Sequence, residues 1–156
     1  MSPAAAETQL KSFVLVPMGS RKMALAAESV IELVASSQEQ GIPHRTPWLS
    51  GVIVRRGRVV PVCDVRRLLG EEASHTGGFH LIVESQVMGT RDWYAIPVVG
   101  ECMLATAETT LPAQDCAEHV VGILPIGDEN VEILDFGKLI QEQELAFVSG
   151  STEPSS

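Results

Sequence analysis

The sequence predicts an all-β protein made of two related halves, each a half-size barrel, that share one hydrophobic core. The chain has 156 residues, 45% of them hydrophobic, which suits a single domain with a well-filled interior. Its apolar runs are short and are separated by Gly, Pro, Asn and Asp, a pattern typical of strands joined by tight turns. The strongest observation is a segment that occurs twice.

The repeated segment keeps a constant register between its two copies. A displacement of 71 positions relates Gly51 to Gly122, Asp64 to Asp135, Leu68 to Leu139, and Met23 to Tyr94. Chance composition does not hold one register over so many positions. The pattern therefore indicates an internal duplication.

Turn residues and short apolar runs divide the first half into elements. Strands are expected at Phe13–Val16 and near Met23–Leu25, with turn chemistry from Pro17 between them. For Glu28–Val34, periodicity does not decide between a strand and one helical turn that leads into a strand. The polar stretch Gln38–Pro47 reads as a loop.

The first copy of the repeat continues this half with a hairpin and a short helix. Strands at Trp48–Val54 and Val59–Cys63 are expected to flank a tight turn at Arg56-Gly57. Asp64 then has the chemistry of an N-cap for a short helix that Gly70 ends.

The second half repeats this order after the charged, glycine-rich stretch 71–78. Its expected elements are a strand at Phe79–Ser85, a turn at Gly89–Asp92, a strand at Trp93–Val98, a loop at Thr106–Glu118, and strands at Val120–Leu124 and Asn130–Leu134 around Gly127-Asp128. Asp135 is expected to cap a last helix from Phe136 to about Phe147.

Charge and composition exclude several functions. A net charge of −9 opposes binding to phosphate backbones, and few aromatic residues are available for base stacking, so a nucleic-acid-binding small barrel is a weak alternative. The charge is uneven, however. Residues 51–70 carry five arginines against one aspartate, a local +4, whereas residues 122–141 carry four acidic residues against one lysine, a local −3. Opposite local charges suit contacts with complementary partner surfaces.

Side chains with catalytic or metal-binding chemistry are scattered. Three cysteines lack CxxC spacing, four histidines lack zinc-site spacing, and the glycines form no nucleotide-binding loop. Asp64 and Asp135 resemble an acid–base pair, but their equivalent positions before two helices favour capping roles. An enzyme would need Cys63, Asp64 and a histidine in one pocket. We therefore expect no metal, no cofactor and no enzymatic activity.

The first residues lack the basic region and apolar run of a secretory signal, and no apolar stretch reaches the length of a membrane span. These features predict a cytoplasmic protein without direct membrane insertion.

Three motifs in order carry a family resemblance. They are Val30-Ile-Glu32-Leu, then Ile42-Pro43-x-x-x-Pro47 followed by Gly51-Val-Ile-x-x-Arg56-Gly57-x-x-x-Pro61-Val62-x-Asp64, and last Val121-Gly-Ile with Leu134-Asp-x-x-Lys138-Leu-Ile. With them, the sequence resembles the CheW family of chemotaxis coupling proteins over most of its length. The resemblance implies two interlocked five-stranded β-barrels around a shared core, with short helices and a C-terminal helix.

The resemblance also implies the domain limits. A single CheW-like domain would span residues 10–147, with a first barrel at about 20–70 and a second at about 79–147 that the N-terminal strand is a candidate to join. Residues 1–9 and 149–156 would be flexible tails.

The implied function is that of a non-catalytic adaptor in a bacterial or archaeal cytoplasm. It would bind the regulatory domain of a CheA-type histidine kinase and the cytoplasmic tip of methyl-accepting chemoreceptors, and so be recruited to membrane-associated receptor arrays. A scaffold of a divergent chemosensory system, governing surface or pilus motility or another output, is the alternative. Val54-Arg55 and Val99 support it because they depart from the family pattern.

Site residues follow from matched positions and from local charge. Arg56 matches the family's arginine and Glu32 the acidic residue expected to pair with it on a neighbouring strand. Those expected at receptor or kinase contacts are Val30, Glu32, Ile42, Arg55, Arg56, Gly57 and Arg58. From the residues alone, the arginines fit the solvated tip of a hairpin, and Glu32 fits an exposed strand position equally well. The resemblance favours binding for Arg56.

Overall fold

The structure is a computed structural model that describes residues 10–36, 39–41, 49–70, 78–87, 90–114 and 117–152. Within them the elements are β1 (Lys11–Met18), β2 (Arg21–Ala26), the 3-10 turn η1 (Ala27–Ser29), β3 (Val30–Ala35), β4 (Gly51–Arg55), β5 (Arg58–Val62), α2 (Val65–Leu68), β6 (Phe79–Val87), β7 (Thr90–Val98), β8 (Met103–Ala107), β9 (Val120–Ile126), β10 (Glu129–Leu134) and α3 (Phe136–Thr152). The protein is mostly β, as predicted.

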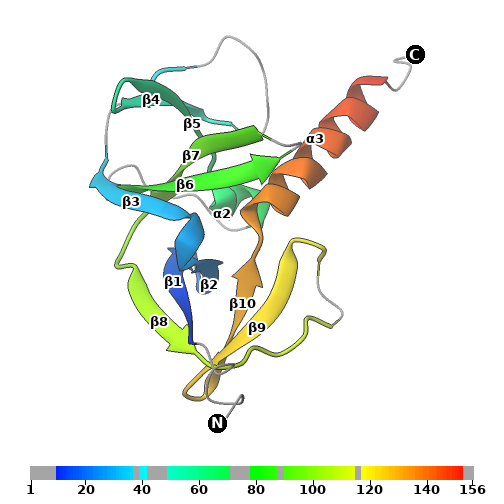
Figure 1. The fold of residues 1–156 in the computed structure, drawn as a ribbon. Coiled ribbons are helices and arrows are strands. Elements are labelled where there is room, and N and C mark those ends of the chain that lie inside the picture. The colour runs from blue at the N-terminus through cyan, green and yellow to red at the C-terminus, as the bar shows by residue number, and fades with distance from the viewer. Residues whose placement is uncertain are drawn as a thin grey trace.

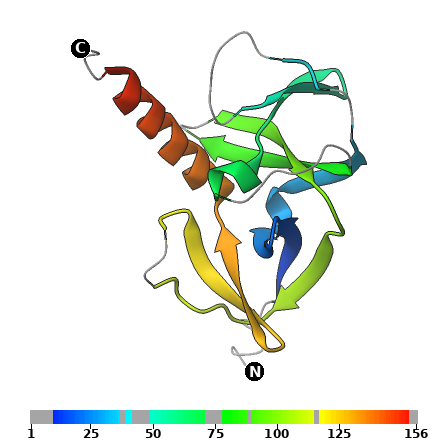
Figure 2. The same cartoon turned by 180° about the vertical axis from the view of Figure 1, so that it is seen from behind.

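The strands form two five-stranded sheets. One has the order β3-β6-β7-β5-β4 and is called the first barrel below; the other has the order β8-β1-β2-β10-β9 and is called the second barrel. Figure 1 shows the first barrel above the second, with α3 running from the end of β10 along the side of the first barrel. Figure 2 shows α2 where the barrels meet.

The duplication predicted from the sequence reappears as equivalent pairing in the two sheets. Val62 pairs with Ala95 in parallel between β5 and β7, and the positions 71 residues away, Ile133 and Ala24, pair in parallel between β10 and β2. Two isolated bridges, Gln40 with Val52 and Leu111 with Ile123, are displaced by the same 71 positions. The repeat is therefore a repeat of structure.

The barrels are not the consecutive segments expected from the sequence. β2, assigned to a first barrel at 20–70, pairs with β10 in the second barrel. β6 and β7, assigned to a second barrel at 79–147, form the centre of the first. Each half gives its opening hairpin to the other half's sheet, and this exchange interlocks the barrels.

The hydrophobic core has three parts. The largest part lies between the barrels and takes residues from both sheets and from α3, including Val14, Met23, Leu81, Ile96 and Leu139. A smaller cluster fills each barrel: Ile53, Val60, Val62, Ile82 and Ala95 in the first, and Phe13, Leu15, Ala24, Leu124, Val131 and Ile133 in the second. Successive residues of a strand alternate between a barrel interior and the shared core.

Both helix caps are confirmed. The backbone N–H of Arg66 donates to Asp64 Oδ1 at 3.2 Å, and that of Lys138 donates to Asp135 Oδ1 at 3.1 Å. Gly70, with φ +81°, follows the short helix as expected. No helix within the described residues is both long and apolar enough to cross a membrane.

Three local expectations were incomplete. The segment Glu28–Val34 takes its second alternative, because η1 leads into β3. β8 was not predicted, since five residues with two alanines gave no strand signal, and its last two residues overlap the expected loop Thr106–Glu118. α3 continues to Thr152, so the first four residues of the expected tail 149–156 are helical. Most of the loop Gln38–Pro47 lies outside the described residues.

Candidate functional site

The candidate site is built around the tip of the β4–β5 hairpin. Arg56 and Gly57 have φ angles of 53° and 74°, so both central residues of the two-residue turn are left-handed, as the twist of a tight hairpin requires. This turn sets Arg55 directly opposite Arg58 on the two strands. The local sequence thus concentrates three guanidinium groups at one end of the first barrel.

Glu32 of β3 holds two of these guanidinium groups. Arg55 donates from Nε to Glu32 Oε2 at 2.8 Å and from Nη2 to Oε1 at 3.0 Å, and Arg56 donates from Nη2 to Oε1 at 3.1 Å. The Glu32 side chain is 16% exposed, whereas Arg55 is 38% and Arg56 62% exposed. The planar guanidinium of Arg55 therefore makes the two-pronged contact, and Arg56 is the more accessible.

The contact joins the two edges of the sheet. β3 and β4 stand at opposite ends of the strand order. Glu32 pairs with Ile82, which lies in the barrel interior. Arg55 is two residues after the interior residue Ile53 on β4 and therefore lies on the same face. Both charged side chains thus lie at the end of the interior face. A bulge between Val30 and Glu32 shifts the register of β3 just before this point.

Mutual hydrogen bonding stabilises the charged forms of this pair. The hydrogen bond from Arg55 lowers the pKa of Glu32, and the nearby charges of Arg55 and Arg56 add to the effect, although partial burial opposes it. The same hydrogen bond raises the pKa of Arg55. The pair therefore stays ionised at neutral pH.

Arg58 is held by a different contact. Its guanidinium lies 3.8 Å from the centre of the Trp93 ring, on β7, in a cation–π arrangement. Glu32, Arg55, Arg56, Arg58 and Trp93 together are called the Glu32 cluster below. Trp93 also packs against the interior residues of the first barrel, so the cluster sits directly on that small core.

The predicted site residues are only partly brought together. Glu32, Arg55 and Arg56 share one network, Gly57 shapes the turn, and Arg58 lies opposite Arg55. Val30 is half-buried at the start of β3 and packs against the shared core. Ile42 lies outside the described residues.

Sequence reasoning missed two features of the cluster. The expected partner of Glu32 was Arg56, yet Arg55 makes the closer and double contact. Alternation along β4 was the available signal, because it places Arg55 on the face of Gly51 and Ile53. Trp93 was not connected to Arg58, which is distant in sequence and on another strand.

A second surface feature consists of Leu33 on β3 and Leu104 on β8. Leu33 of β3 pairs with the core residue Leu81, and Leu104 of β8 pairs with the core residue Val14, so both point to the shared-core side. Yet they are 41% and 77% exposed. β3 and β8 lie on the same side of the molecule in Figures 1 and 2. These two leucines, called the apolar rim below, occupy positions 71 residues apart.

Cys63 and Asp64, the residues that a catalytic pocket would have used, are a buried thiol and a helix cap. Burial, together with the neighbouring Asp64 carboxylate, raises the pKa of the Cys63 thiol to about 12, so it is a poor nucleophile. Asp64 accepts two side-chain hydrogen bonds from the buried Arg66, at 3.0 and 3.1 Å. No group of His, Cys, Asp and Glu able to hold a metal ion occurs among the described residues.

The geometry thus defines a two-barrel protein with an ion cluster at the surface of the first barrel. The model of the CheW-like domain matches residues 12–144. The chain belongs to the CheW-like family.

Similar proteins match over nearly the whole chain. The protein FrzA of Myxococcus xanthus is 26% identical over 140 residues, covering 84% of this chain and 86% of its own. The chemotaxis protein CheW of Klebsiella aerogenes is 24% identical over 157 residues, covering 95% and 92%. The crystal structure of the scaffolding protein TtCheW from Thermoanaerobacter tengcongensis, 20% identical, shares the fold with a TM-score of 0.68 and covers 84% of this chain and 92% of its own.

Proposed function

We propose that this chain is a non-catalytic adaptor that couples chemoreceptors to a CheA-type histidine kinase. It would act in a bacterial or archaeal cytoplasm, recruited to receptor arrays at the membrane through its partners. Family membership supports this role, because a chemotaxis protein and a scaffolding protein are among its relatives. The observation that carries the proposal further is the Glu32 cluster.

The Glu32 cluster presents fixed positive charge at a barrel end. Arg55 and Arg56 are oriented by Glu32, and Arg58 is oriented by Trp93, so a partner would not have to order three flexible side chains. Outside the cluster, Val54 and Val59 pair across the hairpin and are both exposed. Arginines at the end of the hairpin, with an exposed apolar pair on its opposite face, suit contact with an acidic and partly apolar protein surface that surrounds the hairpin. We assign this surface to the kinase regulatory domain.

The apolar rim is the surface we assign to the receptor. Leu33 and Leu104 extend the shared core to the outside, and Val30 packs against that core at the start of the same strand as Leu33. An amphipathic helix, such as the tip of a receptor, binds by laying apolar side chains into such a surface. Glu32 and Leu33 are neighbours on β3 with side chains on opposite faces, so partners at the Glu32 cluster and at the apolar rim would approach the same strand from different sides.

A divergent chemosensory system is the second candidate, and the composition of the hairpin favours it. Arg55, which replaces the apolar residue of the family pattern, forms the main contact with Glu32. Val54, which replaces an asparagine of that pattern, is exposed beside it. These changes alter the surface offered to a partner and suit a kinase with a matching change.

Pull-down with the CheA-type kinase of the same organism, at low and at high salt, tests the proposal. We expect binding that weakens as ionic strength rises, because exposed arginines contribute through screened charge. Binding of equal strength at low and high ionic strength would contradict an electrostatic role for the Glu32 cluster. If the protein bound neither the kinase nor a cytoplasmic fragment of a receptor, the proposed coupling function would be wrong.

A further inference from the structure

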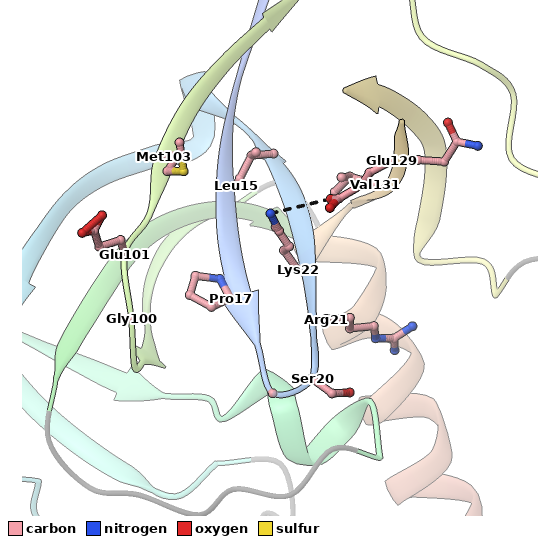
Figure 3. Close-up of a pocket in the computed structure, with 12 residues that line it drawn as sticks. Leu15, Pro17, Ser20, Arg21, Lys22, Gly100, Glu101, Met103, Glu129 and Val131 are labelled. Carbon is pink, nitrogen blue, oxygen red and sulfur yellow. Dashed lines mark ion pairs between the residues drawn. The ribbon is translucent and has the colours of Figure 1, made fainter. Parts of the chain in front are cut away.

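The open end of the second barrel contains a cavity of about 590 Å³. Its lining residues are Leu15, Pro17, Gly19, Ser20, Arg21, Lys22, Gly100, Glu101, Met103, Glu129, Asn130 and Val131. Figure 3 shows Lys22 reaching toward Glu129, with Leu15, Pro17 and Met103 beside them. A cavity of this size lies in the range of ligand sites, about 300–1,000 Å³.

Because of the internal repeat, the first barrel has an equivalent site, and there Trp93 and Arg58 fill it. Lys22, Met103, Glu129 and Val131 lie 71 positions from Trp93, Glu32, Arg58 and Val60, respectively. The β1–β2 and β6–β7 hairpins differ in length, but strand pairing still makes Leu15 equivalent to Ile82, because Met103 pairs with Leu15 as Glu32 pairs with Ile82. The cavity and the Glu32 cluster therefore occupy equivalent ends of the two barrels.

The two ends are closed differently. In the first barrel the indole of Trp93 covers the interior, and Arg58 stacks on it at 3.8 Å. In the second barrel Lys22 and Glu129 take these two positions and form only an ion pair of 3.6 Å. Both of their side chains are about half exposed or more, so this pair contributes little to stability and is easily displaced. The position filled by an indole in one barrel holds only a half-exposed lysine in the other.

The chemistry of the cavity indicates what fills it. Its floor is apolar, since Leu15 and Val131 belong to the interior cluster of the second barrel. Its wall carries two carboxylates, Glu101 and Glu129, and two cations, Arg21 and Lys22, which form ion pairs with Glu132 and Glu129. Glu101 has no hydrogen bond or ion pair to any described residue. Lys22 neutralises only Glu129. An apolar floor below an unneutralised carboxylate suits an aromatic side chain accompanied by a guanidinium.

We propose that this cavity is a docking site for a partner protein that inserts an aromatic side chain next to an arginine from a protruding loop. The inserted pair would reproduce the Trp93–Arg58 stack of the first barrel, with its guanidinium held by Glu101 and Glu129. The inference rests on the cavity and the repeat, and it stands whether or not the chain couples receptors to a kinase.

A blocked dipeptide, acetyl-Arg-Trp-amide, is the direct probe. Titration into the isotope-labelled protein is expected to shift the amide resonances of Lys22, Met103 and Val131 in a saturable way below about 10 mM. Acetyl-Glu-Trp-amide should bind at least about tenfold more weakly, because it places a carboxylate next to Glu101. Absence of saturable shifts, equal binding of the two peptides, or shifts confined to the first barrel would overturn the proposal.

Two variants locate the site. Lys22→Trp combined with Glu129→Arg builds the plug of the first barrel into the second, and we expect it to abolish peptide binding. Glu101→Lys changes one exposed side chain and should reverse the preference between the two peptides while leaving the fold intact. If Glu101→Lys, with an unchanged circular dichroism spectrum, still prefers acetyl-Arg-Trp-amide, the proposed recognition is wrong even if the double variant fails to fold.

Discussion

Glu32 and Arg55 connect the two edge strands of the first barrel through hydrogen bonds of 2.8 and 3.0 Å. The first barrel is therefore joined at this end by side chains. Glu32 also accepts a hydrogen bond from Arg56, whose side chain is 62% exposed. The contact between the edge strands and the proposed partner contact thus share one carboxylate but use different arginines.

Replacing either arginine by alanine is expected to separate these roles. Arg55→Ala removes both prongs of the contact with Glu32 and should lower the midpoint of urea unfolding. Arg56→Ala removes one hydrogen bond from a largely exposed side chain and should change the midpoint much less. Urea unfolding followed by circular dichroism measures both. Equal midpoints for the two variants would show that Arg55 has no special structural role.

The stabilisation by Glu32 should depend on pH. Its folded-state pKa is lowered from the usual 4.5, so the ionised carboxylate stabilises the folded protein above about that pH, and the effect is lost as pH falls through the lowered pKa. Glu32→Gln should therefore be less stable than the natural protein at pH 7, and the difference should shrink as the solution is made acidic. Unfolding free energies measured between pH 7 and the acid limit check this. A difference that is constant with pH would contradict it.

The repeat offers a matched pair of cap substitutions. Asp135→Ala removes one capping hydrogen bond and is expected to cost about 1 kcal/mol. Asp64→Ala removes the equivalent cap and also leaves the buried guanidinium of Arg66 without its carboxylate, so it is expected to cost about 3 kcal/mol or more. Urea unfolding of the two variants measures the difference. Equal costs would show that the Asp64–Arg66 ion pair contributes nothing beyond the cap.

The repeated glycines should also differ in tolerance. A Cβ at Gly51 would lie 2.6 Å from the backbone oxygen of Gln40, which bridges to β4 at Val52, so Gly51→Ala must displace backbone and should cost about 1–3 kcal/mol. At Gly122 the nearest atoms lie at 3.3 Å, and one of them is the end of the flexible Ile133 side chain. Gly122→Ala should therefore cost less. Thermal unfolding of both variants ranks them, and the reverse order would be inconsistent with this packing.

The duplication could be found in the sequence, but its spatial consequence could not. A constant displacement identifies equivalent segments, such as β2 and β7, without saying which strands they pair with. Pairing depends on how the opening hairpin of each half packs on the other half. The exchange of hairpins between the barrels therefore appears only in three dimensions.

The site was predictable to a similar degree. Glu32 and the arginines were found, since charge and family pattern point to them, and alternation along β4 could have selected Arg55. The Arg58–Trp93 stack depends on the positions of β5 and β7 in the sheet, which no local pattern encodes. The exposure of Leu104, an apolar residue in a strand, likewise depends on how the sheets pack and not on the local pattern.

In the proposed function, the exposed Arg56, oriented by Glu32, takes part in coupling a receptor to its kinase. Receptor-dependent kinase activity, reconstituted with natural protein, Arg56→Ala, and Arg67→Ala as an exposed-arginine control outside the Glu32 cluster, tests it most directly. We expect Arg56→Ala to remain folded by circular dichroism and to lose most of the coupled activity, while Arg67→Ala keeps it. A folded Arg56→Ala protein that couples as well as the natural one would contradict the account.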